Sequence, residues 1–288
     1  SAARTPRERV TRSPSFFPQD VTHFMTESSL DLGVIGNCSF GALVDRQARV
    51  VWSCLPAFDG DPAFCSLLSP KGEGGDFAVE LEDFESSEQH YLPNTAVLRT
   101  VLRDSKGGEV EVIDFAPRWR NNGRFYRPVS IIRQIRPLAG NPRIVVRARP
   151  LADWGGRTPD TTWGSNHIRW VLPDFTLRLT TDVPVRFVRD GLPFVLSHPV
   201  SLVLGVDESL TRSLTGYVQE AQERTEEYWR EWVRYLSIPL DWQEAVIRSA
   251  ITLKLCQYED SGAIIAAMTT SIPEAPNTPR NWDYRYCW

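Results

Sequence analysis

The chain has 288 residues, of which 42% are hydrophobic and 24% charged, and its formal net charge is -4. These values are typical of a globular protein with one large core or two smaller ones. The slightly acidic balance excludes no fold but gives no reason to expect a nucleic-acid or membrane partner. Without an apolar run near the ~20 residues of a bilayer span, and without a signal-peptide core, the sequence predicts a cytoplasmic protein.

Residues 1–28 are rich in Arg, Ser, Thr and Pro and predict a poorly ordered arm. From 29 to 213, short β-branched or alternating runs are separated by Gly, Pro, Asn or Asp at intervals of about 8–12 residues, which is typical of antiparallel sandwiches. We therefore expect two stacked antiparallel sheets. The runs are residues 42–44, 49–52, 77–81, 110–113, 130–135, 143–148 and 201–206.

The pattern becomes helical after residue 213. Apolar residues between 218 and 236 recur at spacings of three and four, which predicts an amphipathic helix within 214–238. Asp241 and Glu244 have the spacing of a capping box ahead of a second helix at about 240–258, and Gly262 is a stop signal. The predicted fold is therefore mainly β with C-terminal helices.

Five cysteines contain no CxxC pair, and their odd number argues against a disulfide framework and a zinc knuckle. The four histidines lie far apart, without metal-ligand spacing. We expect most of the cysteines to be reduced core thiols, and we expect no metal site and no cofactor. The cysteines are Cys38, Cys54, Cys65, Cys256 and Cys287.

The last eight residues, 281–288, combine aromatic rings with an amide and a carboxylate. Such a loop suits a saccharide, because rings stack on pyranose faces while short polar groups bond to hydroxyls. A buried aromatic cluster that closes a core is equally compatible with this composition.

Several segments, in order, resemble glycoside hydrolase family 15, the bacterial and archaeal glucoamylases, glucodextranases and trehalases. Residues 261–274 and 280–288 resemble the family's barrel-entry motif, and residues 32–38, 42–44 and 51–59 resemble its opening motif. Residues 91–98 and 110–118 fit its middle strands. The resemblance covers about residue 30 to the end of the sequence.

The resemblance implies an antiparallel super-sandwich over 29–213, a linker helix over 214–238, and the start of an (α/α)6 barrel over 239–288. It implies hydrolysis of an α-glucoside with inversion by two carboxyl groups, both on parts of the barrel beyond this chain. We therefore assign no catalytic residue here and expect the chain alone to be inactive.

By the same resemblance, Tyr284 lies near the developing oxocarbenium ion and Trp288 packs on the same glucose, in a substrate-binding wall with Trp282 and Asp283. A structural role for Asp283, paired to a backbone group or an arginine, is the alternative.

The roles of the tryptophans outside the last eight residues remain open. Trp52 is expected in the core or against the barrel, together with Phe58. Trp154, Trp163 and Trp170 either line a loop that reaches the active-site mouth or are core residues.

The apolar stripe of 218–236 and the first barrel helix predict an exposed apolar surface that needs a cover. Candidate partners besides the α-glucoside substrate are the remainder of the barrel, as a second fragment or as downstream sequence, and a second copy of the chain. Two other functions stay open: part of an inverting disaccharide phosphorylase, or a non-catalytic β-sandwich that binds glycan or protein.

Overall fold

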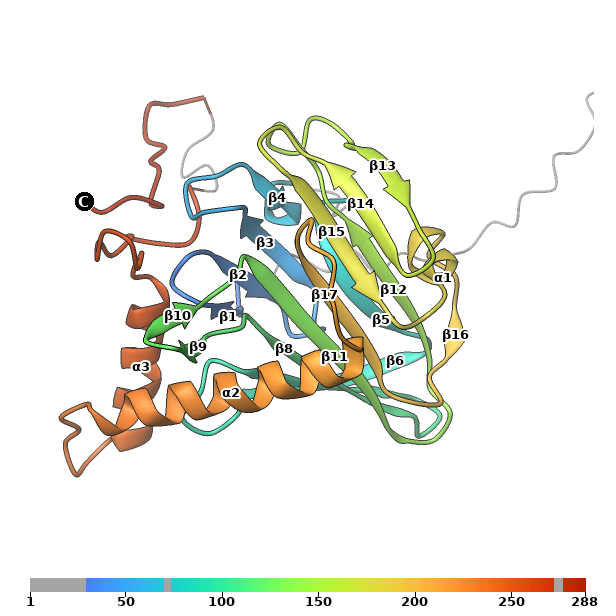
Figure 1. The fold of residues 1–288 in the computed structure, drawn as a ribbon, viewed down its shortest axis with the longest axis horizontal. Coiled ribbons are helices and arrows are strands. Elements are labelled where there is room, and N and C mark those ends of the chain that lie inside the picture. The colour runs from blue at the N-terminus through green and yellow to red at the C-terminus, as the bar shows by residue number, and fades with distance from the viewer. Residues whose placement is uncertain (1–29, 70–73, 272–276) are drawn as a thin grey trace, which may run out of the picture.

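The computed structural model describes residues 30–69, 74–271 and 277–288, so the predicted arm at 1–28 lies outside the described residues. Two antiparallel sheets pack against each other, with one helix along the sandwich and another at its end (Figure 1). This arrangement confirms the predicted fold class.

The first sheet has seven strands. They run in the order β1 (Gly33–Gly36), β2 (Gly41–Val44), β3 (Val50–Cys54), β5 (Asp76–Leu81), β12 (Arg143–Arg149) and β16 (Phe194–Val195), while β4 (Pro62–Phe64) pairs with β3. The short 3-10 helix η1 (Ser66–Leu68) follows β4, and α1 (Val185–Arg189) precedes β16.

The second sheet has eight strands. Their order is β13 (Asp160–Trp163), β14 (His167–Val171), β15 (Thr176–Thr181), β17 (Val200–Val206), β11 (Ser130–Ala139), β8 (Glu109–Phe115), β7 (Leu98–Asp104) and β6 (Phe84–Tyr91). A small separate hairpin pairs β9 (Trp119–Asn121) with β10 (Arg124–Tyr126).

Side chains that alternate along the strands build the core. In β11, Ile131 and Ile135 belong to the cluster between the sheets, whereas Ile132 belongs to a second cluster on the other face. Since successive strand residues point to opposite faces, the eight-stranded sheet is covered on both sides at this strand.

Helix α2 (Leu214–Arg234) supplies that outer cover. Its side chains Val218, Trp229 and Val233 are buried in the cluster that contains Ile132 and Val203. Ser213 caps the helix, because its side chain accepts a hydrogen bond from the Gly216 amide. The expectation that this apolar stripe would need another polypeptide is therefore wrong for α2, since the sandwich itself covers it.

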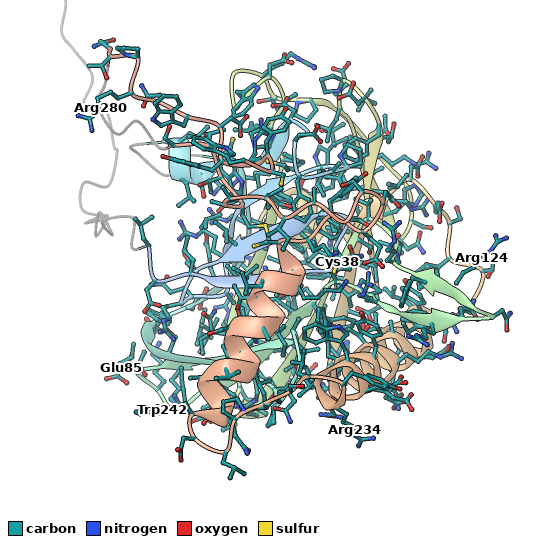
Figure 2. The ribbon with its side chains drawn as sticks, turned by 90° about the vertical axis from the view of Figure 1, so that its left-hand side faces the viewer. Cys38, Glu85, Arg124, Arg234, Trp242 and Arg280 are labelled. Atoms are coloured by element: carbon teal, nitrogen blue, oxygen red, sulfur yellow. The ribbon has the colours of Figure 1, made fainter. Side chains whose placement is uncertain are left out.

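Helix α3 (Gln243–Leu255) lies at the end of the sandwich and faces the viewer in Figure 2. Ile251 and Leu255 are buried, whereas Leu253 is 60% exposed and Trp242 82% exposed. The predicted capping box is wrong: Trp242 occupies the N-cap in a left-handed conformation with φ 61°, and no side chain caps the helix. Within the described ranges, no helix has both the length and the apolar character of a bilayer span.

Candidate functional site: an aromatic cluster pinned to the sandwich

The segment 282–286 runs back along residues 266–271 as a loose antiparallel pair. The Ala267 amide donates to the Tyr284 carbonyl at 2.8 Å, and the Ser271 amide donates to the Trp282 carbonyl at 2.8 Å. An isolated bridge joins Thr270 and Asp283. Backbone pairing therefore fixes the segment that carries the predicted site residues.

Three of the predicted site residues form one ring cluster. The rings of Tyr284 and Trp288 stack with centroids 5.5 Å apart and planes 25° from parallel. The Trp282 ring meets Trp288 edge-on at 5.9 Å and 72°. Tyr284 is half-buried, but Trp282 is 51% exposed and Trp288 72% exposed. The cluster is therefore open to solvent and presents ring surface on which a ligand can stack.

Asp283, the fourth predicted site residue, is engaged by the arginine two positions later. The Arg285 guanidinium binds the carboxylate through Nε at 2.9 Å and through Nη2 at 2.7 Å, and the Arg285 amide donates to the same carboxylate at 3.0 Å. Hydrogen bonds from Arg285 hold the pKa of Asp283 below its ordinary value. An acid kept ionised in this way is unsuited to protonate a leaving group.

The same arginine attaches the ring cluster to the sandwich. Arg285 is 5% exposed, and its Nη1 donates to the Gly60 carbonyl at 2.6 Å, in the connection between β3 and β4. Its neighbour Cys54 is a buried thiol whose pKa burial raises to about 11. The charge of Arg285 is thus offset by Asp283 and by backbone carbonyl oxygen.

Trp154, in the loop after β12, contacts the arginine that attaches the cluster to the sandwich. Its ring lies under the Arg285 guanidinium, with 4.8 Å from Cζ to the ring centroid, and it is 46% exposed. Asp153 and Trp154 have φ angles of 53° and 58°. The Asp61 carboxylate holds this unusual turn, since it accepts hydrogen bonds from the Asp153 amide at 2.6 Å and the Trp154 amide at 3.0 Å.

The other upstream aromatics take different places. Trp52 is buried, and its indole N–H donates to the Met268 carbonyl at 2.7 Å, so it supports the C-terminal segment from within the core. Phe58 and Trp170 are also buried. Trp163 is exposed but lies under Arg189, so the structure does not bring it to the ring cluster.

A buried polar network joins the start of the sandwich to the end of α3. Arg118 is fully buried; it donates to the Asn37 carbonyl at 2.8 Å and pairs with Glu259 at 2.8 Å. The Cys38 thiol donates to the Lys254 carbonyl at 3.2 Å, beside the C-terminal end of α3 in Figure 2. These contacts connect the loop between β1 and β2 with the segment that leads into the ring cluster.

The sequence does not indicate which residues hold the rings. Arg285 lies within the segment 280–288 that resembles the family motif, but its role is apparent only in the structure, as is that of Asp61. Neither residue has a local sequence signal, because Arg285 binds Gly60, which is 225 residues away, and Asp61 binds Asp153, which is 92 residues away. The cysteines Cys38, Cys54, Cys65, Cys256 and Cys287 all carry free thiols, but Cys287 is exposed rather than a core residue.

Comparisons with known proteins agree with the resemblance. A family model described as trehalase-like, N-terminal, matches residues 28–169, and one described as glycosyl hydrolases family 15 matches residues 241–288. A trehalase of Mycolicibacterium smegmatis is 27% identical over 90% of this chain and 42% of its own length. Trehalase 1 of Sulfolobus acidocaldarius is 31% identical over 89% of this chain and 43% of its own length. A trehalase of Thermoplasma volcanium is 28% identical over 89% of the chain. The chain thus spans less than half the length of these relatives.

Proposed function

We propose that the chain is the N-terminal portion of a trehalase-like family 15 glycoside hydrolase, and that the whole enzyme hydrolyses trehalose and releases glucose with inversion. The observation that carries this proposal is the open ring cluster of Trp282, Tyr284 and Trp288, in the segment that matches the family model. Glucose has apolar ring faces and polar edges, so exposed aromatic rings suit it.

The roles of the site residues follow from their surroundings. Trp288 and Trp282 offer exposed ring surface to the sugar, and the Tyr284 hydroxyl is proposed to lie near the carbon where positive charge develops. Asp283 binds Arg285 with both carboxylate oxygens, so its proposed role is to position the ring-bearing segment. Direct contact of Asp283 with the sugar stays a prediction.

The proton-transfer groups are proposed to lie outside this chain. Inversion requires two carboxyl groups about 6.5–9.5 Å apart: one protonates the leaving oxygen, and the other activates a water molecule on the opposite face of the sugar. Asp283 is the carboxylate inside the ring cluster, and its lowered pKa keeps it ionised. Additional barrel helices are proposed to supply the acid and the base and to cover Leu253 and Trp242 on α3.

The test compares the 288-residue chain with the chain completed by the remainder of the barrel. Both are assayed for glucose release from trehalose, maltose and isomaltose, with NMR detection of the anomer formed first. In the completed protein we expect equal amounts of β- and α-glucose from trehalose, because only the attacked carbon is inverted and the leaving glucose keeps its α configuration. We expect no activity in the chain alone. Strict dependence on phosphate would instead favour the disaccharide phosphorylase, and glucose release by the chain alone would contradict the assignment of the carboxylates.

Variants in the completed protein test the ring cluster. Trp288→Ala removes a stacking surface worth about 2 kcal/mol, so kcat/KM should fall about 30-fold. Tyr286→Phe is the matched control, because Tyr286 is a neighbouring, 50% exposed tyrosine outside the cluster contacts described above. Equal losses of kcat/KM in both variants would mean that the ring cluster does not support the proposed function.

A further inference from the structure

A second candidate site lies on the outer face of the eight-stranded sheet, where the start of α2 and the connection after β17 border a hollow. The hollow has a volume of about 160 Å³, and Ser130, Arg178, Gly205, Glu208 and Tyr217 are among its lining residues. This volume lies below the range of about 300–1,000 Å³ for drug-sized ligands, so the hollow suits a smaller molecule. None of the lining residues belongs to the ring cluster.

Strand register explains why a hollow forms here. Ser130 of β11 and Arg178 of β15 both lie opposite Gly205 of β17, so the three positions form one row across the sheet. In each strand an adjacent residue, Ile131, Leu179 or Leu204, belongs to the core between the sheets, which puts this row on the outer face. Gly205 stands in the middle without a side chain, and a Cβ there would come within 2.6 Å of the Val129 carbonyl oxygen. The floor of the hollow therefore stays open.

Ser130 provides an unused hydrogen-bonding group in the hollow. It is 6% exposed, and its hydroxyl has no hydrogen-bond partner among the described residues. A buried polar group without a partner costs about 1–3 kcal/mol, which a ligand hydroxyl can recover. Nearby, the Tyr217 and Tyr126 hydroxyls lie 3.2 Å apart, and each phenol can both donate and accept.

The charges around the hollow are balanced. Arg178 donates to Asp207 at 3.2 Å and to the Thr180 hydroxyl at 3.1 Å, and Asp207 also pairs with Arg169 at 2.9 Å. Among the lining residues, the charged ones are Arg178 and Glu208, whose charges are opposite. This balance disfavours an anionic or a cationic ligand and favours an uncharged one with several hydrogen-bonding groups.

We propose that this hollow binds a small uncharged polyhydroxylated molecule, a monosaccharide or a linear polyol, through Ser130, Tyr217 and Arg178. The hydroxyl of Ser130 donates to a ligand oxygen or accepts from a ligand hydroxyl, while the fixed guanidinium of Arg178 contributes donors. Binding here is separate from the proposed glucose wall and does not depend on the hydrolase assignment.

The test is a ligand-observed NMR titration of the full chain with glucose, with glycerol and with inorganic phosphate. Saturable binding of glucose or glycerol is expected, and the two arms distinguish a ring-form sugar from a linear polyol. Ser130→Ala should weaken binding about tenfold, the effect of one lost hydrogen bond. The same variant should leave the melting temperature unchanged or higher, because it removes a hydroxyl that has no partner in the free protein.

Two controls locate the binding. Ser66→Ala changes an equally buried serine in the other part of the sandwich, whose hydroxyl donates to the Val51 carbonyl, and should leave polyol affinity unchanged. Trp288→Ala removes the exposed ring of the proposed glucose wall, so it should affect at most the glucose signal and should leave the affinity for glycerol unchanged. The proposal is overturned if no polyol binding saturates, if Ser130→Ala has no effect, if Trp288→Ala abolishes the binding of glycerol, or if phosphate binds in preference.

Discussion

Removal of the Asp283 carboxylate tests how the ring cluster is held. In Asp283→Ala, the Arg285 guanidinium keeps its hydrogen bond to the Gly60 carbonyl but loses its counter-ion and two short hydrogen bonds. The Arg285 side chain is 4% exposed and that of Asp283 34% exposed. The substitution therefore leaves a buried cation without its carboxylate.

The expected loss of free energy that holds the segment in place in Asp283→Ala lies between two limits. Loss of one partner of a fully buried pair costs about 3–5 kcal/mol, whereas exposed pairs contribute about 0–1 kcal/mol. Because Asp283 is about one-third exposed, water replaces part of the lost interaction, and we expect about 2 kcal/mol. At about 1.4 kcal/mol per factor of ten, the open state of the segment should become about 30-fold more populated.

Hydrogen exchange measures the population of the open state directly at the amides of Ala267 and Ser271, which donate to the carbonyls of the ring-bearing segment. Their protection should fall about 30-fold in Asp283→Ala. The matched control is Asp190→Ala, since Asp190 forms the same two-pronged pair with Arg189 at an exposed site and should change protection little. Unchanged protection in Asp283→Ala would refute the view that Arg285 pins the segment.

Three further predictions use other features of the structure. Hydrogen bonds from the Arg285 guanidinium lower the pKa of Asp283 in the folded state. The stabilisation of the ring-bearing segment by this pair should therefore be complete above the unfolded-state pKa of about 3.9 and be lost as pH falls through the folded-state pKa. Hydrogen-exchange protection measured between pH 6 and 3 will show this loss. Trp52→Phe loses the hydrogen bond to the Met268 carbonyl and some ring volume, and denaturant unfolding should report about 2 kcal/mol less stability. Burial raises the pKa of Cys54 to about 11, so at pH 8 alkylation followed by mass spectrometry should find exposed Cys287 modified and Cys54 protected until unfolding.

The β-sandwich and both long helices could be predicted from the sequence because their signals are local. Alternating runs become strands, and spacings of three and four become a helical stripe. The cover that α2 provides was missed, although the consecutive Ile131 and Ile132 of β11 are typical of a strand buried on both faces. The capping-box prediction failed because Asp241 lies just outside a helix whose N-cap is Trp242.

Long-range polar contacts could not be predicted in this way. The buried Arg133 and Asp114 form a pair at 2.7 Å between neighbouring strands, and nothing in either strand's pattern marks it. The partners of Arg285 and Trp154 likewise come from loops far away in the sequence. Residue types alone therefore left sugar binding and a buried aromatic cluster both open, and the exposure of the rings could be seen only in the fold.

The structure also explains why the opening and closing motifs occur together in one chain. Trp52 in β3 donates to the Met268 carbonyl, and Gly60 after β3 accepts from Arg285, so residues 51–60 form the surface on which the closing segment rests. The Trp282 and Trp288 rings are exposed, so packing against the sandwich fixes their positions only weakly. A sugar that stacks on Trp288 therefore depends on groups in the sandwich that never touch it, because a stacking surface is useful only when rigid elements fix its place. The sandwich is in this sense part of the proposed binding site, and substitutions in β3 should alter sugar affinity without removing any contact to the sugar.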